Sequence, residues 1–145
     1  MNESKLDMTK IIAWANNLEV GIDFIDQDHI QLIDVINEVY ELIEVKAAAP
    51  QIAKAFNKLS AVTLSHFAHE EQKMAEIHYK YEVAHRAEHK KLINEFKMLK
   101  MKFDATNVLS ETTSMFLRDW LLKHIATVDA AFAEAIRQAE QIVRV

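Results

Sequence analysis

The stretch HFAHEEQKMAEIHYKYEVAHRAEH, residues 66–89, contains two helical stripes separated by a short break near residues 78–80. On each side of the break, selected side chains recur every three or four residues, which places them on one face of an α-helix. The stripe before the break is His66, Glu70, Met74 and Ile77, and the stripe after it begins with Tyr81, His85 and His89. A break this short predicts two neighbouring, antiparallel helices.

The same periodicity occurs in four stretches, with short breaks near residues 47–50, 78–80 and 104–109. Pro50 suits the first turn of the second helix, and Ser110 suits the N-cap of the fourth. Outside residues 66–89, the stripes are Ile25, His29, Leu32, Ile36, Val39 and Ile43; Ile52, Phe56, Leu59 and Thr63; Leu92, Phe96, Leu99 and Phe103; and Leu117, Leu121, His124 and Val128. The pattern predicts an all-α, antiparallel up-down four-helix bundle.

The length of 145 residues indicates one domain, 1–145, with its core at about residues 12–130. The first 20 or so residues carry Trp14 and Leu18 and are expected to pack as an N-terminal arm. Residues 130–145, rich in Ala and carrying Phe132 and Ile136, predict a short C-terminal helical tail.

The residue counts exclude several classes of protein. With one Gly and one Pro, a β-sandwich or barrel lacks the residues that its tight turns need. Without Cys, the chain has no disulfide scaffold, zinc ribbon or cysteine nucleophile.

The charge and hydropathy of the chain indicate where it works. Seventeen basic and 22 acidic residues give a net charge of −5, which argues against nucleic acid as the main partner. No stretch approaches the ~18 apolar residues of a membrane span, and the charged start lacks the apolar core of a signal peptide. We therefore expect a cytoplasmic protein without a membrane span.

Five of the seven histidines interrupt apolar stripes, where an unpaired imidazole would be costly to bury. A single such histidine is usually a hydrogen-bonded core residue, but here five occur on four helices, with carboxylates beside them. His85 and His89 are four residues apart, as are His66 and Glu70, so each pair shares one helix face. The candidate metal ligands are His29, His66, Glu70, His85, His89, His124 and Asp129.

Asp129 does not share the four-residue spacing of these pairs. It follows His124 by five residues, a rotation of about 140° on a regular helix. Asp129 therefore reaches inward only if the helix loosens or ends there. The other two histidines, His69 and His78, fall off the stripes, and we expect both to be exposed.

Five imidazoles and two carboxylates suit two first-row transition-metal ions bridged by the carboxylates. Seven ligands exceed what one tetrahedral zinc takes, and calcium and magnesium prefer oxygen. Iron fits this donor set, and manganese, cobalt or zinc could occupy the same site.

Two short motifs offer other interpretations. His85-Arg-Ala-Glu-His89 matches the H-x-x-E-H pattern of inverted zinc peptidases, with Glu88 as the base. Glu82-Val-Ala-His85 matches one Glu-x-x-His motif of the ferritin-like carboxylate proteins, which need a second copy that this chain lacks. Both patterns are short enough to arise by chance.

The order His29, His66-x-x-x-Glu70, His85-x-x-x-His89, His124-x-x-x-x-Asp129 resembles the ligand set of the hemerythrins, over about residues 12–130. The flanking residues are similar to the bacterial branch of that family: Trp14-x-x-x-Leu18-x-Val20-Gly21-Ile22, Ile25-Asp26-x-x-His29, His66-Phe67-x-x-Glu70-Glu71 and Trp120-Leu121-x-x-His124-Ile125. Asp28 departs from the pattern, since Gln is common there.

The resemblance implies two non-haem irons, without haem, bridged by Glu70, Asp129 and a solvent-derived oxo or hydroxo group. One iron would take His85, His89 and His124, and the other His29 and His66. The second iron would keep an open position where dioxygen binds. Trp120, Ile125, Leu121 and Phe67 would line that pocket.

The implied function is reversible dioxygen binding for storage, transport or delivery, without enzymatic turnover and with an unidentified protein as possible recipient. An oxygen or redox sensor acting through a partner protein is an alternative, as is an enzyme that reduces peroxide or nitric oxide. The remaining alternative is a helical bundle that binds no metal.

Overall fold

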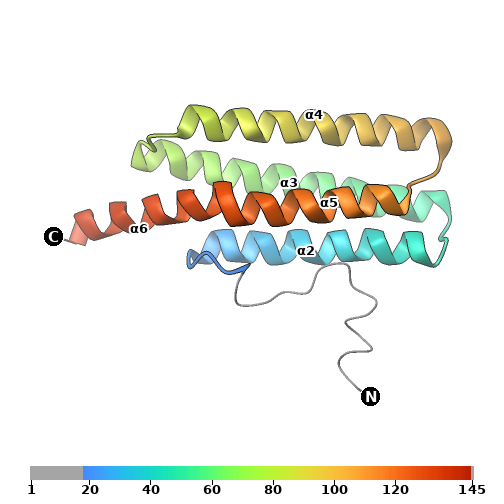
Figure 1. The fold of residues 1–145 in the computed structure, drawn as a ribbon, viewed down its shortest axis with the longest axis horizontal. Helices are drawn as coiled ribbons and strands as arrows, with labels where there is room; N and C mark the ends of the chain where they lie inside the picture. The colour runs from blue at the N-terminus through green and yellow to red at the C-terminus, as the bar shows by residue number, and fades with distance from the viewer. Residues whose placement is uncertain (1–17, 145) are drawn as a thin grey trace, which may run out of the picture.

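The computed structural model describes residues 18–144, which form helices connected by short turns (Figure 1). The elements are α2 (Asp23–Glu44), α3 (Ala49–Ile77), α4 (Glu82–Thr106), α5 (Glu111–His124), η2 (Ile125–Asp129) and α6 (Ala130–Arg144). The predicted N-terminal arm with Trp14 falls mostly on residues 1–17, outside the described residues.

Helices α2, α3, α4 and α5 lie side by side and alternate in direction (Figure 1). Helix α2 packs against both α3 and α5, and α3 packs against α4. The prediction of an all-α, up-down four-helix bundle is therefore confirmed. The turns, residues 45–48, 78–81 and 107–110, overlap the predicted breaks and differ from them by at most three residues at either end. The loops are as short as the sequence indicated.

Local signals explain several helix ends. Pro50 lies in the first turn of α3, and the Ser110 side chain accepts a hydrogen bond from the Thr113 backbone N–H at 3.3 Å. Helix α2 begins at Asp23, two residues before Ile25, the first residue of its predicted stripe. The Asp26 carboxylate accepts hydrogen bonds from the backbone N–H groups of Val20 and Gly21, which fixes the chain as it enters α2.

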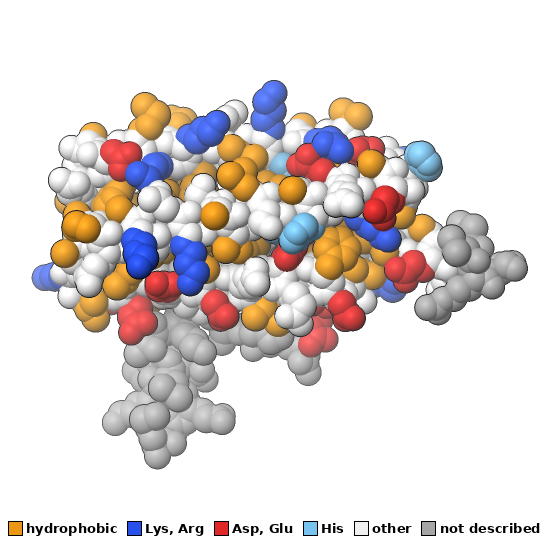
Figure 2. All heavy atoms as spheres, turned by 180° about the vertical axis from the view of Figure 1, so that it is seen from behind, with side chains coloured by type: hydrophobic (Ala, Val, Ile, Leu, Met, Phe, Trp, Pro, Cys, Tyr) orange, Lys and Arg blue, Asp and Glu red, His pale blue; other side chains and the backbone are white. Residues whose placement is uncertain are grey.

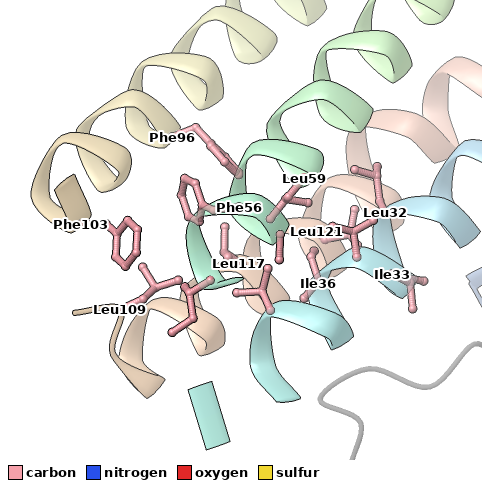
Figure 3. Close-up of a cluster of buried hydrophobic side chains, with 14 of the residues drawn as sticks. Leu32, Ile33, Ile36, Phe56, Leu59, Phe96, Phe103, Leu109, Leu117 and Leu121 are labelled. Atoms are coloured by element: carbon pink, nitrogen blue, oxygen red, sulfur yellow. The ribbon is translucent and has the colours of Figure 1, made fainter. Parts of the chain in front are cut away.

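One apolar cluster fills the bundle between the α2–α3 turn and the middle of the helices. Figure 3 shows its labelled side chains pointing toward one another. The labelled members are Leu32, Ile33 and Ile36 on α2, Phe56 and Leu59 on α3, Phe96 and Phe103 on α4, Leu109, and Leu117 and Leu121 on α5. The apolar stripes of the sequence therefore face this common core.

A second apolar cluster closes the other end of the bundle. Its buried members are Ile22, Ile25, Met74, Phe132, Ala133 and Ile136. The last three belong to α6, which continues the line of α5 (Figure 1). The predicted tail is helical as expected, but its first half is part of the core because Phe132 and Ile136 are fully buried.

A polar layer separates these two apolar clusters. On α2, His29 lies between Ile25 and Leu32; on α3, His66 and Glu70 lie between Leu59 and Met74. All four of these apolar residues are fully buried, so the polar side chains are enclosed from both ends. Such a layer is costly unless its groups pair with one another or with a bound cation.

The surface is of mixed charge. Figure 2 shows charged side chains of both signs scattered among hydrophobic ones on one face, with little histidine visible. Among the described helices, none combines the length and the apolar content needed to span a bilayer.

The burial of α6 predicts a large difference between two phenylalanine truncations. Phe132→Ala removes a fully buried ring, which should lower the free energy of unfolding by about 3–5 kcal/mol. Phe116→Ala, at a ring that is 40% exposed, should cost less than about 1 kcal/mol. Urea denaturation of the metal-free protein measures both, and equal costs would show that α6 is not part of the core.

Candidate metal centre

The seven candidate ligands meet in one buried layer of the bundle. His29 comes from α2, His66 and Glu70 from α3, His85 and His89 from α4, His124 from the end of α5 and Asp129 from the end of η2. Each is at most 3% exposed. The helical spacing in the sequence brings them together because each helix presents these side chains on its inner face.

The five-residue step from His124 to Asp129 is accommodated by a change in helix type. Residues Ile125–Asp129 form a π-helical turn between two α-helices. A π-turn is wider than an α-turn, and such turns often occur at functional sites. Here the extra residue places Asp129 on the same side as His124, which is the loosening that the sequence required.

Asp129 lies between two sets of imidazoles. Its Oδ2 is 2.6 Å from His29 Nε2 and 3.3 Å from His66 Nε2. Its Oδ1 is 2.9 Å from His124 Nε2 and 3.4 Å from His85 Nε2. One carboxylate therefore presents a separate oxygen to each set.

Glu70 connects the same two sets from α3. Its Oε1 is 3.0 Å from His89 Nε2, 3.4 Å from His85 Nε2 and 3.5 Å from His66 Nε2. Glu70 is fully buried, so its charge depends on these neighbours for compensation.

Ligand atoms gather in two overlapping groups within which every pair lies within 4.8 Å. One group is Glu70, His85, His89 and His124, and the other is His66, Glu70, His124 and Asp129. Four buried atoms among them have no hydrogen-bond partner within the described residues: Glu70 Oε2, His85 Nε2, His124 Nε2 and Asp129 Oδ1. These unpaired lone-pair donors, buried together, fit a site for metal cations.

The charges of the cluster stabilise one another in the absence of metal. Burial disfavours the charged form of His66, but its hydrogen bonds to Asp129 and Asp28 outweigh this and raise its pKa to about 10. Burial also disfavours the charged form of His124, but Asp129 and Glu70 outweigh this and raise its pKa to about 9. Burial alone would raise the pKa of Asp129, yet His124, His29 and His66 hold it well below its usual range.

Two imidazoles have carboxylate partners on their outer nitrogens. His66 Nδ1 lies 2.9 Å from Asp28 Oδ2, and His89 Nδ1 lies 2.8 Å from Glu71 Oε2. Arg86 in turn donates to Glu71 at 2.7 Å. A carboxylate on the outer nitrogen fixes the tautomer of a ligating histidine and makes it a stronger donor.

The sequence left the partners of Asp26 and Asp28 unassigned, and the structure supplies them. It also shows that His69 contacts Asp28, at 2.9 Å between Nδ1 and Oδ2. His69 is 50% exposed and His78 is exposed, as expected for both. The i, i+3 spacing of His66 and His69 was the only signal in the sequence for the shared partner.

Two of the candidate pocket residues, Phe67 and Trp120, contact each other with 6.5 Å between ring centroids, and both contact His124. Phe67 is buried and stacks on His89 with 3.8 Å between ring centroids, and it also contacts His66 and His124. Leu121 and Ile125 are buried in the larger apolar cluster. Trp120 is half-buried and lies beside His124, in a surface hollow of about 350 Å³.

The two alternative motifs do not gain support from this geometry. Glu88 lines the surface hollow beside Trp120, and Glu82 accepts a hydrogen bond from Arg86 at 2.8 Å. Neither belongs to a group of ligand atoms among the described residues.

Residues 20–136 match the family model described as the hemerythrin HHE cation binding domain. The chain belongs to the hemerythrin family. The match includes all seven candidate ligands and the buried first half of α6, so the hemerythrin domain extends past Asp129.

This hemerythrin is similar to several bacteriohemerythrins. It is 30% identical to that of Pseudomonas aeruginosa over 128 residues, 88% of this chain and 83% of the relative. It is 28% identical to that of Stenotrophomonas maltophilia over 127 residues, with 88% and 82% covered. It is 25% identical to the myohemerythrin of Sipunculus nudus, with 81% and 87% covered.

Solved structures agree with this assignment. A crystal structure of wild-type hemerythrin superposes with a TM-score of 0.80 at 28% identity, covering 86% of this chain and 97% of that one. The bundle of this hemerythrin and that of its solved relative therefore correspond over nearly their whole lengths.

The raised pKa values predict that metal binding releases protons. At pH 7.5, His66 and His124 each carry a proton that a metal must displace, because metals bind neutral imidazole. Displacing two protons makes the apparent affinity fall about 100-fold for each pH unit of acidification. Calorimetric titration of the protein with metal, in buffers of different ionisation enthalpy, counts the protons that are released. If no proton were released at pH 7.5, the protonated state of His66 and His124 would be contradicted.

Proposed function

We propose that this hemerythrin binds dioxygen reversibly at two iron ions held by His29, His66, Glu70, His85, His89, His124 and Asp129. The observation that supports this most directly is the position of Asp129, whose two oxygens face different imidazole sets. A carboxylate in this position is suited to bridge two cations. Iron, when bound in such a pair, supplies the two electrons that reversible dioxygen binding requires.

The number of imidazoles differs between the two proposed metal positions. The His85, His89 and His124 set offers three, and the His29 and His66 set offers two. Because both sets share Glu70 and Asp129, the second position has one protein ligand fewer. We assign dioxygen binding to this less occupied position.

The surroundings of the cluster keep water out. The apolar clusters on either side of the polar layer are formed by fully buried side chains such as Leu32 and Phe132. We assign Phe67, which contacts His66, together with Leu121 and Ile125 to the apolar wall of the dioxygen pocket. Trp120, the other candidate, contacts His124 and so lies beside the three-imidazole position. A dry site limits proton entry and so slows irreversible oxidation.

We propose a carrier, serving storage, transport or delivery in the cytoplasm, and not an enzyme. The role of the protein side chains is to hold charge and exclude solvent. Dioxygen is the proposed partner, and a protein that receives it is a further expectation. Neither proposal requires a membrane or a nucleic acid.

The carrier proposal predicts a reversible spectral change. The protein loaded with two ferrous ions without air should take up one dioxygen per two irons and develop intense near-ultraviolet and visible absorption. Evacuation should restore the original spectrum over several cycles. Steady consumption of dioxygen, peroxide or nitric oxide beyond this stoichiometry would instead favour the enzyme alternative.

The assignment of the second position predicts the effect of His29→Ala. This variant removes one of only two imidazoles there and should lose reversible dioxygen binding, while retaining one tightly bound iron per chain. His78→Ala, at an exposed histidine outside the cluster, should match the original protein. Optical oxygen titration and iron analysis test both, and two tightly held irons with intact oxygenation in His29→Ala would refute the assignment.

A further inference from the structure

Asp28 joins a buried histidine to a half-exposed one. Its Oδ2 lies 2.9 Å from His66 Nδ1 and 2.9 Å from His69 Nδ1. Asp28 is on α2, whereas both histidines are on α3, one turn apart. The two contacts therefore tie these helices together directly behind the metal-binding nitrogen of His66.

The geometry fixes which nitrogen of His66 is available to a metal. When Nδ1–H donates to Asp28, the lone pair of a neutral imidazole is on Nε2. His66 Nε2 faces the cluster, 3.3 Å from Asp129 Oδ2 and 3.5 Å from Glu70 Oε1. Asp28 thus holds the ring in the orientation that a ligand needs.

His69 adds a second donor to the same carboxylate oxygen. The Asp28 side chain is 13% exposed and the His69 side chain 50% exposed, so this contact is the outer one. Both residues line a surface hollow of about 370 Å³, together with Phe24, Gln27, Gln72, Lys73 and Glu76. With two donors on one oxygen, Asp28 has little freedom to turn away from His66.

This support is distributed unevenly over the five imidazoles. His66 and His89 have carboxylate partners on Nδ1, whereas Nδ1 of His29, His85 and His124 has no hydrogen-bond partner within the described residues. The three-imidazole set therefore has one supported member in three, and the two-imidazole set has one in two. Because the His29 and His66 position has fewer imidazoles, its metal affinity depends more on how strongly each imidazole binds the metal.

We propose that Asp28 and His69 are positioning residues that strengthen metal binding selectively at the His29 and His66 position. The inference rests on the ligand assignment of the proposed function. Asp28 acts directly on the His66 ring, and His69 acts through Asp28.

Metal titration tests the selectivity. Cobalt(II) is the probe, because it is stable in air and its absorption reports each ligand set. In the original protein we expect two cobalt sites of different affinity, of which the weaker is the His29 and His66 position. Asp28→Ala should weaken the weaker site by about 10–100-fold, the usual cost of losing such a hydrogen bond, and leave the tighter site within about threefold.

Matched variants separate positioning from a general loss of structure. Asp28→Asn keeps an acceptor without the charge and should have an intermediate effect. His69→Ala should weaken the same site by less than Asp28→Ala, and His69→Asn should restore it, since the Asn amide nitrogen can occupy the place of Nδ1. His78→Ala is the exposed-histidine control and should change neither site.

A proton resonance gives a second readout, independent of affinity. In the cobalt-loaded protein, a ligating imidazole whose Nδ1–H is held by a carboxylate should give a paramagnetically shifted, slowly exchanging signal. Asp28→Ala should remove the signal of His66 by speeding its exchange with water. Glu71→Ala should remove that of His89 instead.

The outcomes are distinguishable. Fewer than two cobalt ions per chain in the original protein would overturn the proposed function itself. Two ions with unchanged affinities and signals in Asp28→Ala would overturn the positioning role alone. Equal weakening of both sites by Asp28→Ala would overturn the selectivity for the His29 and His66 position. Equal metal affinities in His69→Ala and His69→Asn would overturn the part played by His69.

Discussion

The carboxylate of Asp129 is the group on which the arrangement of the centre depends. It is fully buried, and its two oxygens face His29 and His66 on one side and His124 and His85 on the other. The π-helical turn Ile125–Asp129 is what directs it inward. Because α6 continues from that turn and packs Phe132 into the core, the position of Asp129 is fixed from both ends.

Burying so many polar groups is costly, and the structure limits the cost in two ways. Carboxylates and imidazoles pair with one another, so neither charge is left alone in an apolar environment. The apolar clusters on both sides hold the helices in register, which keeps the ligand atoms close even without a cation. The buried polar groups that carry this free-energy cost are the same ones whose lone pairs a bound metal would use. Stability and metal binding therefore draw on the same residues.

Much of this could be predicted from the sequence. The four stripes, the short breaks and the capping residues Pro50 and Ser110 are local signals, and they define the bundle. The convergence of the histidines follows from their positions on those stripes. The π-turn was foreseeable only as a requirement, since a five-residue step from His124 to Asp129 demands it. The hydrogen bonds of Asp28 could not be foreseen, because they join α2 to α3 across about 40 residues and depend on how the helices pack. The burial of the first half of α6 could have been predicted, since Phe132 and Ile136 are four residues apart and therefore share one helix face.

The central claim is that one buried layer holds two coupled metal ions in unequal environments. Mössbauer spectroscopy of the protein loaded with 57Fe and fully oxidised tests it most directly. We predict two quadrupole doublets of equal area, because the two ferric ions have different numbers of imidazole ligands. We also predict a diamagnetic ground state, because the shared carboxylates and the expected oxo or hydroxo bridge couple the two ions. A single doublet from equivalent irons, or the magnetic spectrum of isolated ferric ions, would contradict the account.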